Sequence, residues 1–328
     1  MSMKVKTVEG KEFSSVQGVA LLDSAINAGL IFEYSCKNGQ CGVCKTALLE
    51  GEVKELKPQL SLTQQDCEKG MVLSCCCEPV SDVLIDAEDL SALHGIEVKT
   101  LPARINAIEQ KSAGIVKVKL RLPPSADFQF LEGQYIDVIG PNGVQRSYSV
   151  ASTSANKEIA LLIKKVEGGV LSEYWFEVAK ENDLVRIEGP KGTFFVRDVN
   201  KPLLFLGTGT GIAPIISMLK RLNEDKSFVQ KFPIYVFWGN RHVEDFVWKP
   251  VLKKLNVEFY QVLSRSDEVW DKSVGYVQDV ALGTVPSIKE FHVYACGSNQ
   301  MIQNARELFC GAGLLEKNFF SDAFVQSY

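Results

Sequence analysis

The sequence predicts a multidomain protein of α+β and α/β architecture, with three parts at residues 1–93, 97–199 and 200–328. Three observations predict this class. A cysteine-rich loop lies in the first part, apolar and charged residues alternate strictly in the second, and solid apolar runs end at glycine in the third. A length of 328 residues, at about 100–200 residues per domain, accommodates two or three such parts.

Residues 1–93 begin with a hairpin and a helix. The segment KVKTVEGKEF predicts a hairpin that turns near Gly10, and VALLDSAINAGL predicts a helix. Val19, Leu22 and Ile26 fall on one face of that helix. Gly29 is placed to end it. A long cysteine-bearing loop and a closing strand in MVLSCCCEPVSDVLID complete a compact domain, and residues 90–98 follow as a linker.

Residues 97–199 are rich in predicted strands. In IVKVKLRLP, Val116, Val118 and Leu120 alternate with Lys117 and Lys119. This period of two is typical of a half-buried strand in an antiparallel sheet. QYIDVIGPNGVQRSYSVAS, EIALLIKKV and DLVRIEGPKGTFFV continue the pattern, with Gly and Pro turns between them. An antiparallel barrel is therefore expected.

Residues 200–328 have a different pattern of apolar residues from the part before them. The apolar runs PLLFLG, PIYVFWG and FHVYACG alternate with helical patterns, as expected for a parallel sheet covered on both faces. The segment 202–219 has no charged residue and is near the length of a membrane span. It contains Gly207, Gly209, Gly211 and Pro214, which predict a strand, a loop and a helix start. We therefore expect no membrane partner.

The charge distribution bounds the partners. The formal net charge is −4, so no basic surface marks a nucleic-acid partner. Residues 1–95 carry 8 Lys, no Arg and 14 acidic residues, which gives 8 − 14 = −6. That surface could guide docking to an electropositive protein or could serve solubility alone. Nine cysteines and the absence of an export signal at the start predict a cytoplasmic protein whose clustered cysteines bind metal.

The segment CKNGQCGVC supplies a set of metal ligands. Cys36, Cys41 and Cys44 form C-x4-C-x2-C, and Cys75 follows after 30 intervening residues, which is the spacing of a plant-type [2Fe–2S] site. Glycines in the loop allow backbone N–H groups to point at sulfur. A structural zinc site usually needs two C-x2-C knuckles, and only Cys41 and Cys44 form one. A Rieske centre needs two histidines, and none lies near these cysteines.

The same region resembles plant-type ferredoxins beyond its cysteines. LLDSAINAGL precedes the loop, and LSCCCEPVSD places a cysteine four residues before Pro79 with Ser-Asp beyond, as that family does. The resemblance implies a β-grasp domain with Cys75 as the fourth ligand. Cys76 and Cys77 are interpreted as packing residues, because free cysteine behaves as a small hydrophobe.

The second part resembles ferredoxin–NADP reductase-like proteins. RSYS at 146–149 matches their flavin motif R-x-Y-[ST], with GQY at 133–135 upstream and GGVLS at 168–172 downstream. The resemblance implies a flavin-binding β-barrel in which an arginine grips pyrophosphate and a tyrosine faces the isoalloxazine. The serine that follows the tyrosine would bond ring N5. The residues alone fit FAD or FMN, and the family implies FAD. The implied flavin contacts are Arg146, Ser147, Tyr148, Ser149, Gly169, Val170 and Ser172.

The third part resembles the nucleotide domain of the same family. GTGTGIAP follows an apolar strand and would cradle the pyrophosphate of a nicotinamide dinucleotide, with Thr208 where the family usually has Gly. YACGS places Cys296 near the nicotinamide C4 position, and Phe324 would cover the flavin face until nicotinamide displaces it. The implied dinucleotide contacts are Gly207, Thr208, Gly209, Thr210, Gly211, Cys296 and Gly297. The implied catalytic residues are Ser149, Cys296 and Phe324. Arg241 could meet a 2′-phosphate or stack on adenine, so NADPH is possible. The resemblance implies NADH.

The order of the three parts implies an electron path. Reductases of ring-hydroxylating and di-iron oxygenases share it, and RIEGPKGTFFVR, VYACGS and FFSDAFV resemble the CDP-6-deoxy-3,4-glucoseen reductases more closely. A nicotinamide donates two electrons and a [2Fe–2S] cluster accepts one, so a flavin must stand between them. We expect an NAD(P)H-dependent reductase that feeds the dehydrase of CDP-3,6-dideoxyhexose synthesis. The alternatives are an oxygenase reductase component and a redox-sensing flavoprotein.

Overall fold

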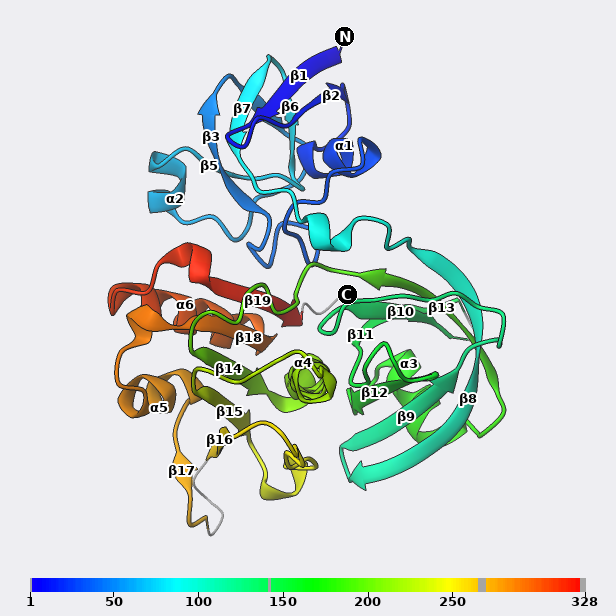
Figure 1. Cartoon of the computed structure of the whole chain (residues 1–328). Coiled ribbons are helices and arrows are strands. Elements are labelled where there is room, and N and C mark those ends of the chain that lie inside the picture. The colour runs from blue at the N-terminus through cyan, green and yellow to red at the C-terminus, as the bar shows by residue number, and fades with distance from the viewer. Residues whose placement is uncertain (1, 141–142, 265–269, 325–328) are drawn as a thin grey trace. The chain divides into compact units, whose positions relative to one another are not determined.

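The computed structural model describes residues 2–140, 143–264 and 270–324. The described residues form two compact units, one up to Ile96 and one from Glu97 to Phe324 (Figure 1). The predicted boundary at 199–200 falls inside the second unit and remains a prediction. Residues 325–328, at the end of the third predicted part, lie outside the described residues.

The first unit is a mixed sheet crossed by one helix, which is the predicted β-grasp arrangement. The sheet has the order β2-β1-β7-β3-β5, with β1 antiparallel to β2 and parallel to β7. Its strands are β1 (Ser2–Thr7), β2 (Glu12–Val16), β3 (Lys45–Glu50), β5 (Met71–Leu73) and β7 (Val83–Asp86). A separate pair is formed by β4 (Val53–Glu55) and β6 (Cys77–Pro79), and the helices are α1 (Leu21–Asn27) and α2 (Gln64–Glu68).

Helix α1 begins two residues later than the helix that the sequence predicts. It begins at Leu21, so Val19 precedes it, and its buried residues are Leu21, Leu22, Ser24 and Ala25. Gly29 follows its end with a φ of +83°, and its N–H bonds to the Ile26 carbonyl, as expected of a glycine that ends a helix. The helix thereby closes the core of the sheet just before the cysteine loop begins.

The first half of the second unit is a six-stranded antiparallel barrel. Its order is β11-β10-β13-β8-β9-β12, and a bridge between Val150 and Leu161 joins the two ends (Figure 1). Val116, Val118 and Leu120 are buried inside it, so the predicted alternation is confirmed. The strands are β8 (Lys99–Ser112), β9 (Ile115–Arg121), β10 (Tyr135–Ile139), β11 (Gln145–Ser149), β12 (Glu158–Lys164) and β13 (Leu184–Lys191). A single helical turn, α3 (Val170–Glu173), runs into a wider turn at Tyr174–Val178.

The second half is a parallel sheet with the order β17-β16-β15-β14-β18-β19. Its strands are β14 (Leu203–Thr208), β15 (Ile234–Asn240), β16 (Val257–Leu263), β17 (Ser273–Val274), β18 (His292–Ser298) and β19 (Phe319–Phe324). Helix α4 (Ile212–Glu224) covers one face, and α5 (Val277–Thr284) and α6 (Asn299–Gly311) cover the other (Figure 1). The uncharged run 202–219 is thus β14, a turn and the start of α4. Within the described part of the chain, no helix has the length and apolar character needed to cross a membrane.

One hydrophobic core joins the barrel to the parallel sheet. Ala151, Leu162 and Phe194 of the barrel are buried in the same cluster as Phe205 and Met218 of the nucleotide half. Their contact excludes water from the junction and holds the two halves as a single body. The ends of the barrel strands and the carboxyl edge of the parallel sheet therefore keep fixed positions relative to each other.

Candidate functional site

The four predicted cluster ligands lie in the first unit as two pairs. The Sγ atoms of Cys44 and Cys75 are 3.1 Å apart, and Cys36 is hydrogen-bonded to Cys41. The second pair comes from the loop after α1, while Cys44 and Cys75 flank β3 and β5. Among the described residues, no three His, Cys, Asp or Glu side chains converge as they would around a single metal ion. Two thiols for each of two irons is the arrangement that a [2Fe–2S] cluster requires.

Hydrogen bonds favour a thiolate in each pair. The bond from Cys41 is the largest cause that lowers the pKa of Cys36 to about 6, and the bond from Cys44 likewise lowers the pKa of Cys75 to about 7. The pKa values of Cys41 and Cys44 are raised, first by those same partners and then by burial. Backbone N–H groups of residues 38, 40 and 41 also point at Cys36, and that of residue 39 points at Cys75. Donors that converge on sulfur fit an iron-bound thiolate.

Gly39 shows why the loop needs glycine. Its φ is +81°, and an added Cβ would lie 2.2 Å from the Pro58 carbonyl oxygen and 3.0 Å from Cys76 Sγ. A side chain here would displace either the neighbouring backbone or the buried sulfur. The backbone at Gly39 therefore lies so close to a buried sulfur and to the neighbouring backbone that only glycine fits there.

The strand of the predicted flavin motif is tied to the barrel by a carboxylate that the motif does not contain. β11 pairs with β10 so that Ser147 lies opposite Asp137. The Asp137 carboxylate, which is buried, accepts hydrogen bonds from Ser147 Oγ at 2.5 Å, Gln145 Nε2 at 2.7 Å and Lys191 Nζ at 2.7 Å. β11 is the first strand in the sheet order and pairs along its length only with β10. The bonds to Asp137 therefore add a second restraint on its position.

The other motif residues occupy varied environments. The Tyr148 hydroxyl accepts a hydrogen bond from Trp175 Nε1 at 3.2 Å, and burial raises the pKa of Tyr148 to about 12. Arg146 is exposed and donates to the Gln145 carbonyl, whereas Ser149 is buried at the strand end. In the segment expected to bind phosphate, Gly169 precedes α3, Val170 is exposed, and Ser172 Oγ accepts from the Val166 N–H at 2.7 Å. The expected helix is a single turn.

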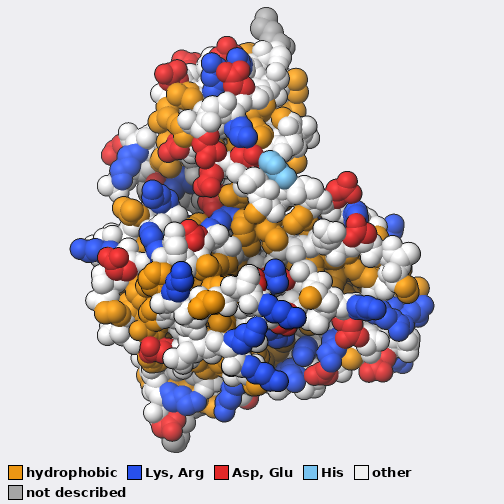
Figure 2. Space-filling model, in the orientation of Figure 1, with side chains coloured by type: hydrophobic (Ala, Val, Ile, Leu, Met, Phe, Trp, Pro, Cys, Tyr) orange, Lys and Arg blue, Asp and Glu red, His pale blue; other side chains and the backbone are white. Residues whose placement is uncertain are grey.

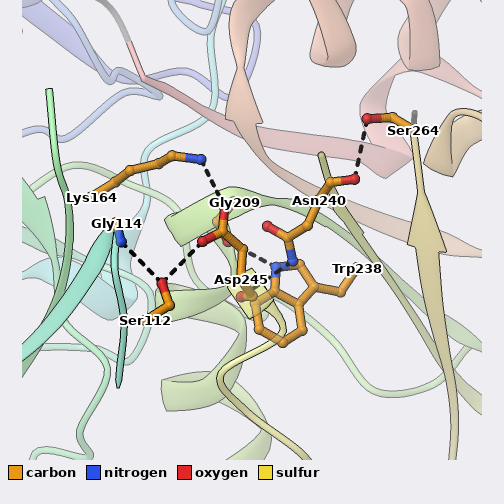
Figure 3. Close-up of polar contacts among 8 residues, drawn as sticks. All are labelled: Ser112, Gly114, Lys164, Gly209, Trp238, Asn240, Asp245 and Ser264. Carbon is orange, nitrogen blue, oxygen red and sulfur yellow. Dashed lines mark hydrogen bonds and ion pairs between the residues drawn. The ribbon is translucent and has the colours of Figure 1, made fainter. Parts of the chain in front are cut away.

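The glycine-rich loop is held by a tryptophan and a threonine. Gly209–Gly211, with Thr210 between the glycines, forms a tight turn between β14 and α4, and Trp238 Nε1 donates to the Gly209 carbonyl at 2.8 Å (Figure 3). Thr208 Oγ1 accepts from the Ser298 N–H at 3.2 Å. A Cβ on Gly297, whose φ is +144°, would lie 2.0 Å from that oxygen. The departure from the family pattern at 208 is thus accommodated by glycine at 297.

Cys296 lies beside this loop on the central strand β18. It is fully buried, opposite Gly207 on one side and Asp322 on the other. Burial, and then the charge of Asp322, raise the pKa of the Cys296 thiol well above its ordinary value, so the thiol is neutral. Asp322 is buried too, and no sequence motif pointed to it. Phe324 ends β19 opposite Ser298 and is 39% exposed.

A second buried carboxylate joins the nucleotide half to the barrel. Asp245, in the short turn after β15, accepts from Ser112 Oγ at 3.1 Å and pairs with Lys164 Nζ at 3.3 Å (Figure 3). Its side chain is 6% exposed. Asn240 Nδ2 donates to the Asp245 carbonyl, which ties this turn back to the carboxyl end of β15. The segment after β15 leaves the edge of the sheet where dinucleotides bind in α/β folds, and Asp245 anchors it.

Replacing Asp245 with alanine should loosen this segment. Loss of two charge-assisted hydrogen bonds from a buried carboxylate predicts that amides 243–247 exchange with solvent about tenfold faster. Hydrogen exchange followed by mass spectrometry would measure this, with Glu244→Ala as the control because Glu244 is exposed beside it. Equal exchange in the two variants would contradict the anchoring role.

The three parts match three protein families. Residues 6–80 match the 2Fe-2S iron-sulfur cluster binding domain, residues 102–196 the oxidoreductase FAD-binding domain, and residues 205–307 the oxidoreductase NAD-binding domain. These matches and the pairing of the thiols agree on an oxidoreductase that uses a [2Fe–2S] cluster, FAD and a nicotinamide dinucleotide.

Relatives similar to this chain have the same extent. CDP-6-deoxy-L-threo-D-glycero-4-hexulose-3-dehydrase reductase of Yersinia pseudotuberculosis is 40% identical over 100% of both chains. Protein RfbI of Salmonella typhimurium is 37% identical over 96% of this chain and 94% of its own. The toluate 1,2-dioxygenase electron transfer component of Pseudomonas putida is 27% identical over 94% of each.

A solved structure shares the fold. The Amycolatopsis cytochrome P450 reductase GcoB matches with a TM-score of 0.73 and 24% identity over 99% of both chains. The 40% identity to the Yersinia protein over the full length of both chains, together with the three domain matches, shows the family. The chain belongs to the CDP-6-deoxy-hexulose-3-dehydrase reductases, electron-transfer oxidoreductases of the ferredoxin reductase superfamily.

Proposed function

We propose that this chain passes electrons from NADH to the dehydrase that acts on a CDP-linked 6-deoxy-hexulose in 3,6-dideoxyhexose synthesis. The observation that carries this proposal is the 40% identity to the Yersinia dehydrase reductase over the full length of both chains. The cysteine content and the buried free thiols suit the reducing cytoplasm, which is the compartment we propose.

Cys36, Cys41, Cys44 and Cys75 are proposed to hold the cluster. Their pairing, the two lowered thiol pKa values and the backbone donors around them support this assignment. When bound, the flavin and the cluster together convert a two-electron donor into single-electron deliveries. The chain's part is to orient these groups and to exclude water from them.

The second unit is proposed to hold FAD and the dinucleotide at its two halves. Arg146–Ser149 and Gly169–Ser172 would contact the flavin, and Gly207–Gly211 and Gly297 would contact the dinucleotide pyrophosphate and nicotinamide. Cys296 keeps its proton because it is buried beside Asp322, so it would offer a neutral thiol to the nicotinamide. Ser149 and Phe324 remain the proposed contacts at the flavin ring. The shared core would keep the flavin and nicotinamide positions in register.

The partner is proposed to approach the first unit. Its formal charge of 8 − 14 = −6 over residues 1–95 would favour encounter with an electropositive protein. Figure 2 shows acidic side chains on the visible face of that unit. An oxygenase component is the second candidate partner, because a dioxygenase electron transfer component is similar over 94% of this chain.

The test is reconstitution with a purified CDP-hexulose dehydrase and its CDP-linked substrate. Anaerobic NADH oxidation should proceed only when reductase, dehydrase and substrate are all present. Rapid cytochrome c reduction without any dehydrase-dependent NADH oxidation would favour an oxygenase partner. Slow turnover with every acceptor would favour a redox sensor.

Serine at Cys44 should remove the cluster. Because Cys44 pairs with Cys75 inside the core, the Cys44→Ser protein should contain less than about half of the iron of the unaltered chain. Iron and sulfide analysis after anaerobic reconstitution would measure this. Cys67→Ser is the control, since Cys67 is an exposed free cysteine and its loss should leave the iron content unchanged.

Asparagine at Asp137 should weaken flavin binding, although Asp137 is not itself a proposed flavin contact. A neutral carboxamide loses the charge that holds Ser147 and Lys191, so we expect the FAD dissociation constant to rise about tenfold. Fluorescence titration of the apoprotein with FAD would measure it. Glu188→Gln removes another carboxylate from Lys191 but leaves Ser147 bonded, and should change the constant less than twofold. Equal effects would show that Asp137 does not position β11.

A further inference from the structure

Three adjacent cysteines, Cys75–Cys77, lie between the end of β5 and the start of β6, and the proposed cluster accounts for only one of them. Cys76 is fully buried, and its Sγ lies 3.5 Å from Cys75 Sγ. Cys77 is buried to the same degree, but it lies in β6 opposite Glu55. The two extra thiols therefore differ in what they face: Cys76 faces the sulfur of a proposed ligand, and Cys77 faces a strand pair.

The direction of the contact between Cys76 and Cys75 follows from iron binding. A thiolate bound to iron carries no proton, so Cys75 can only accept the hydrogen bond. Cys76 is not among the proposed ligands, and its fully buried sulfur lies within hydrogen-bonding distance of Cys75 Sγ, where its S–H can donate. The Pro58 carbonyl lies farther away, at 3.8 Å from Cys76 Sγ. A charged sulfur is also a stronger acceptor than a neutral carbonyl.

The surrounding packing keeps Cys76 in this position. Gly39, whose N–H points at Cys75, presents its bare Cα to Cys76 Sγ, and a Cβ there would approach that sulfur to 3.0 Å. The Cys76 N–H is bonded to the Leu73 carbonyl at 2.8 Å, and its own carbonyl accepts from the Leu56 N–H at 2.7 Å. The side chain is therefore held from both its backbone and its sulfur end.

We propose that the Cys76 thiol donates a hydrogen bond to the sulfur of Cys75 and raises the midpoint potential of the cluster. This inference rests on the proposed function, in which Cys75 is a ligand. A hydrogen bond to a ligand sulfur stabilises the reduced cluster, which carries more negative charge, more than the oxidised one. Cys76 thus acts through Cys75 and positions a proton, while it binds no iron itself.

The experiment is a redox titration of the intact holoprotein, followed by the electron paramagnetic resonance signal of the reduced cluster. Cys76→Ala and Cys76→Val should both shift the midpoint potential to more negative values. We expect up to a tenfold change in the one-electron equilibrium constant, or about 59 mV. Cys76→Ser retains an O–H donor and should stay close to the unaltered protein. Cys77→Ala is the matched control and should leave the potential unchanged.

Each other outcome also decides the proposal. Midpoint potentials in all four variants equal to that of the unaltered protein would overturn it. Equal shifts in Cys76→Ala and Cys77→Ala would also overturn it. Loss of the cluster in the Ala and Val variants, with retention in Ser, would show that the same donor is needed and would support it. Loss of iron in all three Cys76 variants, or retention of iron by Cys75→Ala, would make Cys76 a ligand and refute it. NADH oxidation through the dehydrase, measured on the unaltered protein, tests the proposed function separately.

Discussion

Buried sulfur is the constraint on which the first unit depends. Cys44 and the three cysteines 75–77 occupy the same core as Leu21 and Leu22, where charge is costly unless hydrogen bonds or a metal compensate it. The loop before β3 meets this requirement with backbone N–H groups, and Gly39 allows the approach that they need. Few apolar side chains lie in that loop, so its order and its capacity for iron depend on each other.

The second unit solves a different problem, which is to hold two redox-active ligands at one fixed separation. Phe194 of the barrel and Met218 of α4 meet in one continuous core, and Asp245 adds a polar anchor at its edge. Asp137 does the same for the strand of the flavin motif. A buried carboxylate in each half of this unit therefore holds a strand or a loop that apolar packing alone would leave adjustable.

The sequence predicts well what is local and poorly what depends on strand register. The cysteine spacing, RSYS and the glycine-rich loop are contiguous, so their elements could be named in advance. Asp137 meets Ser147 and Asp322 meets Cys296 only because particular strands pair in a particular register, and Asp245 meets Lys164 across 81 residues. The single turn of α3 was also not foreseeable, because a wider turn at Tyr174 replaces its continuation.

The continuous core of the second unit determines where such a chain can be recombined. A cut near residue 200 would expose the apolar faces that contain Phe194 and Phe205, and both fragments would be prone to aggregate in water. The first unit has its own hydrophobic core, so a junction after Ile96 does not divide a core and exposes no comparable apolar face. We therefore expect gene fusions that exchange the electron-delivery domain, in nature or in the laboratory, to join the chains at the boundary after Ile96.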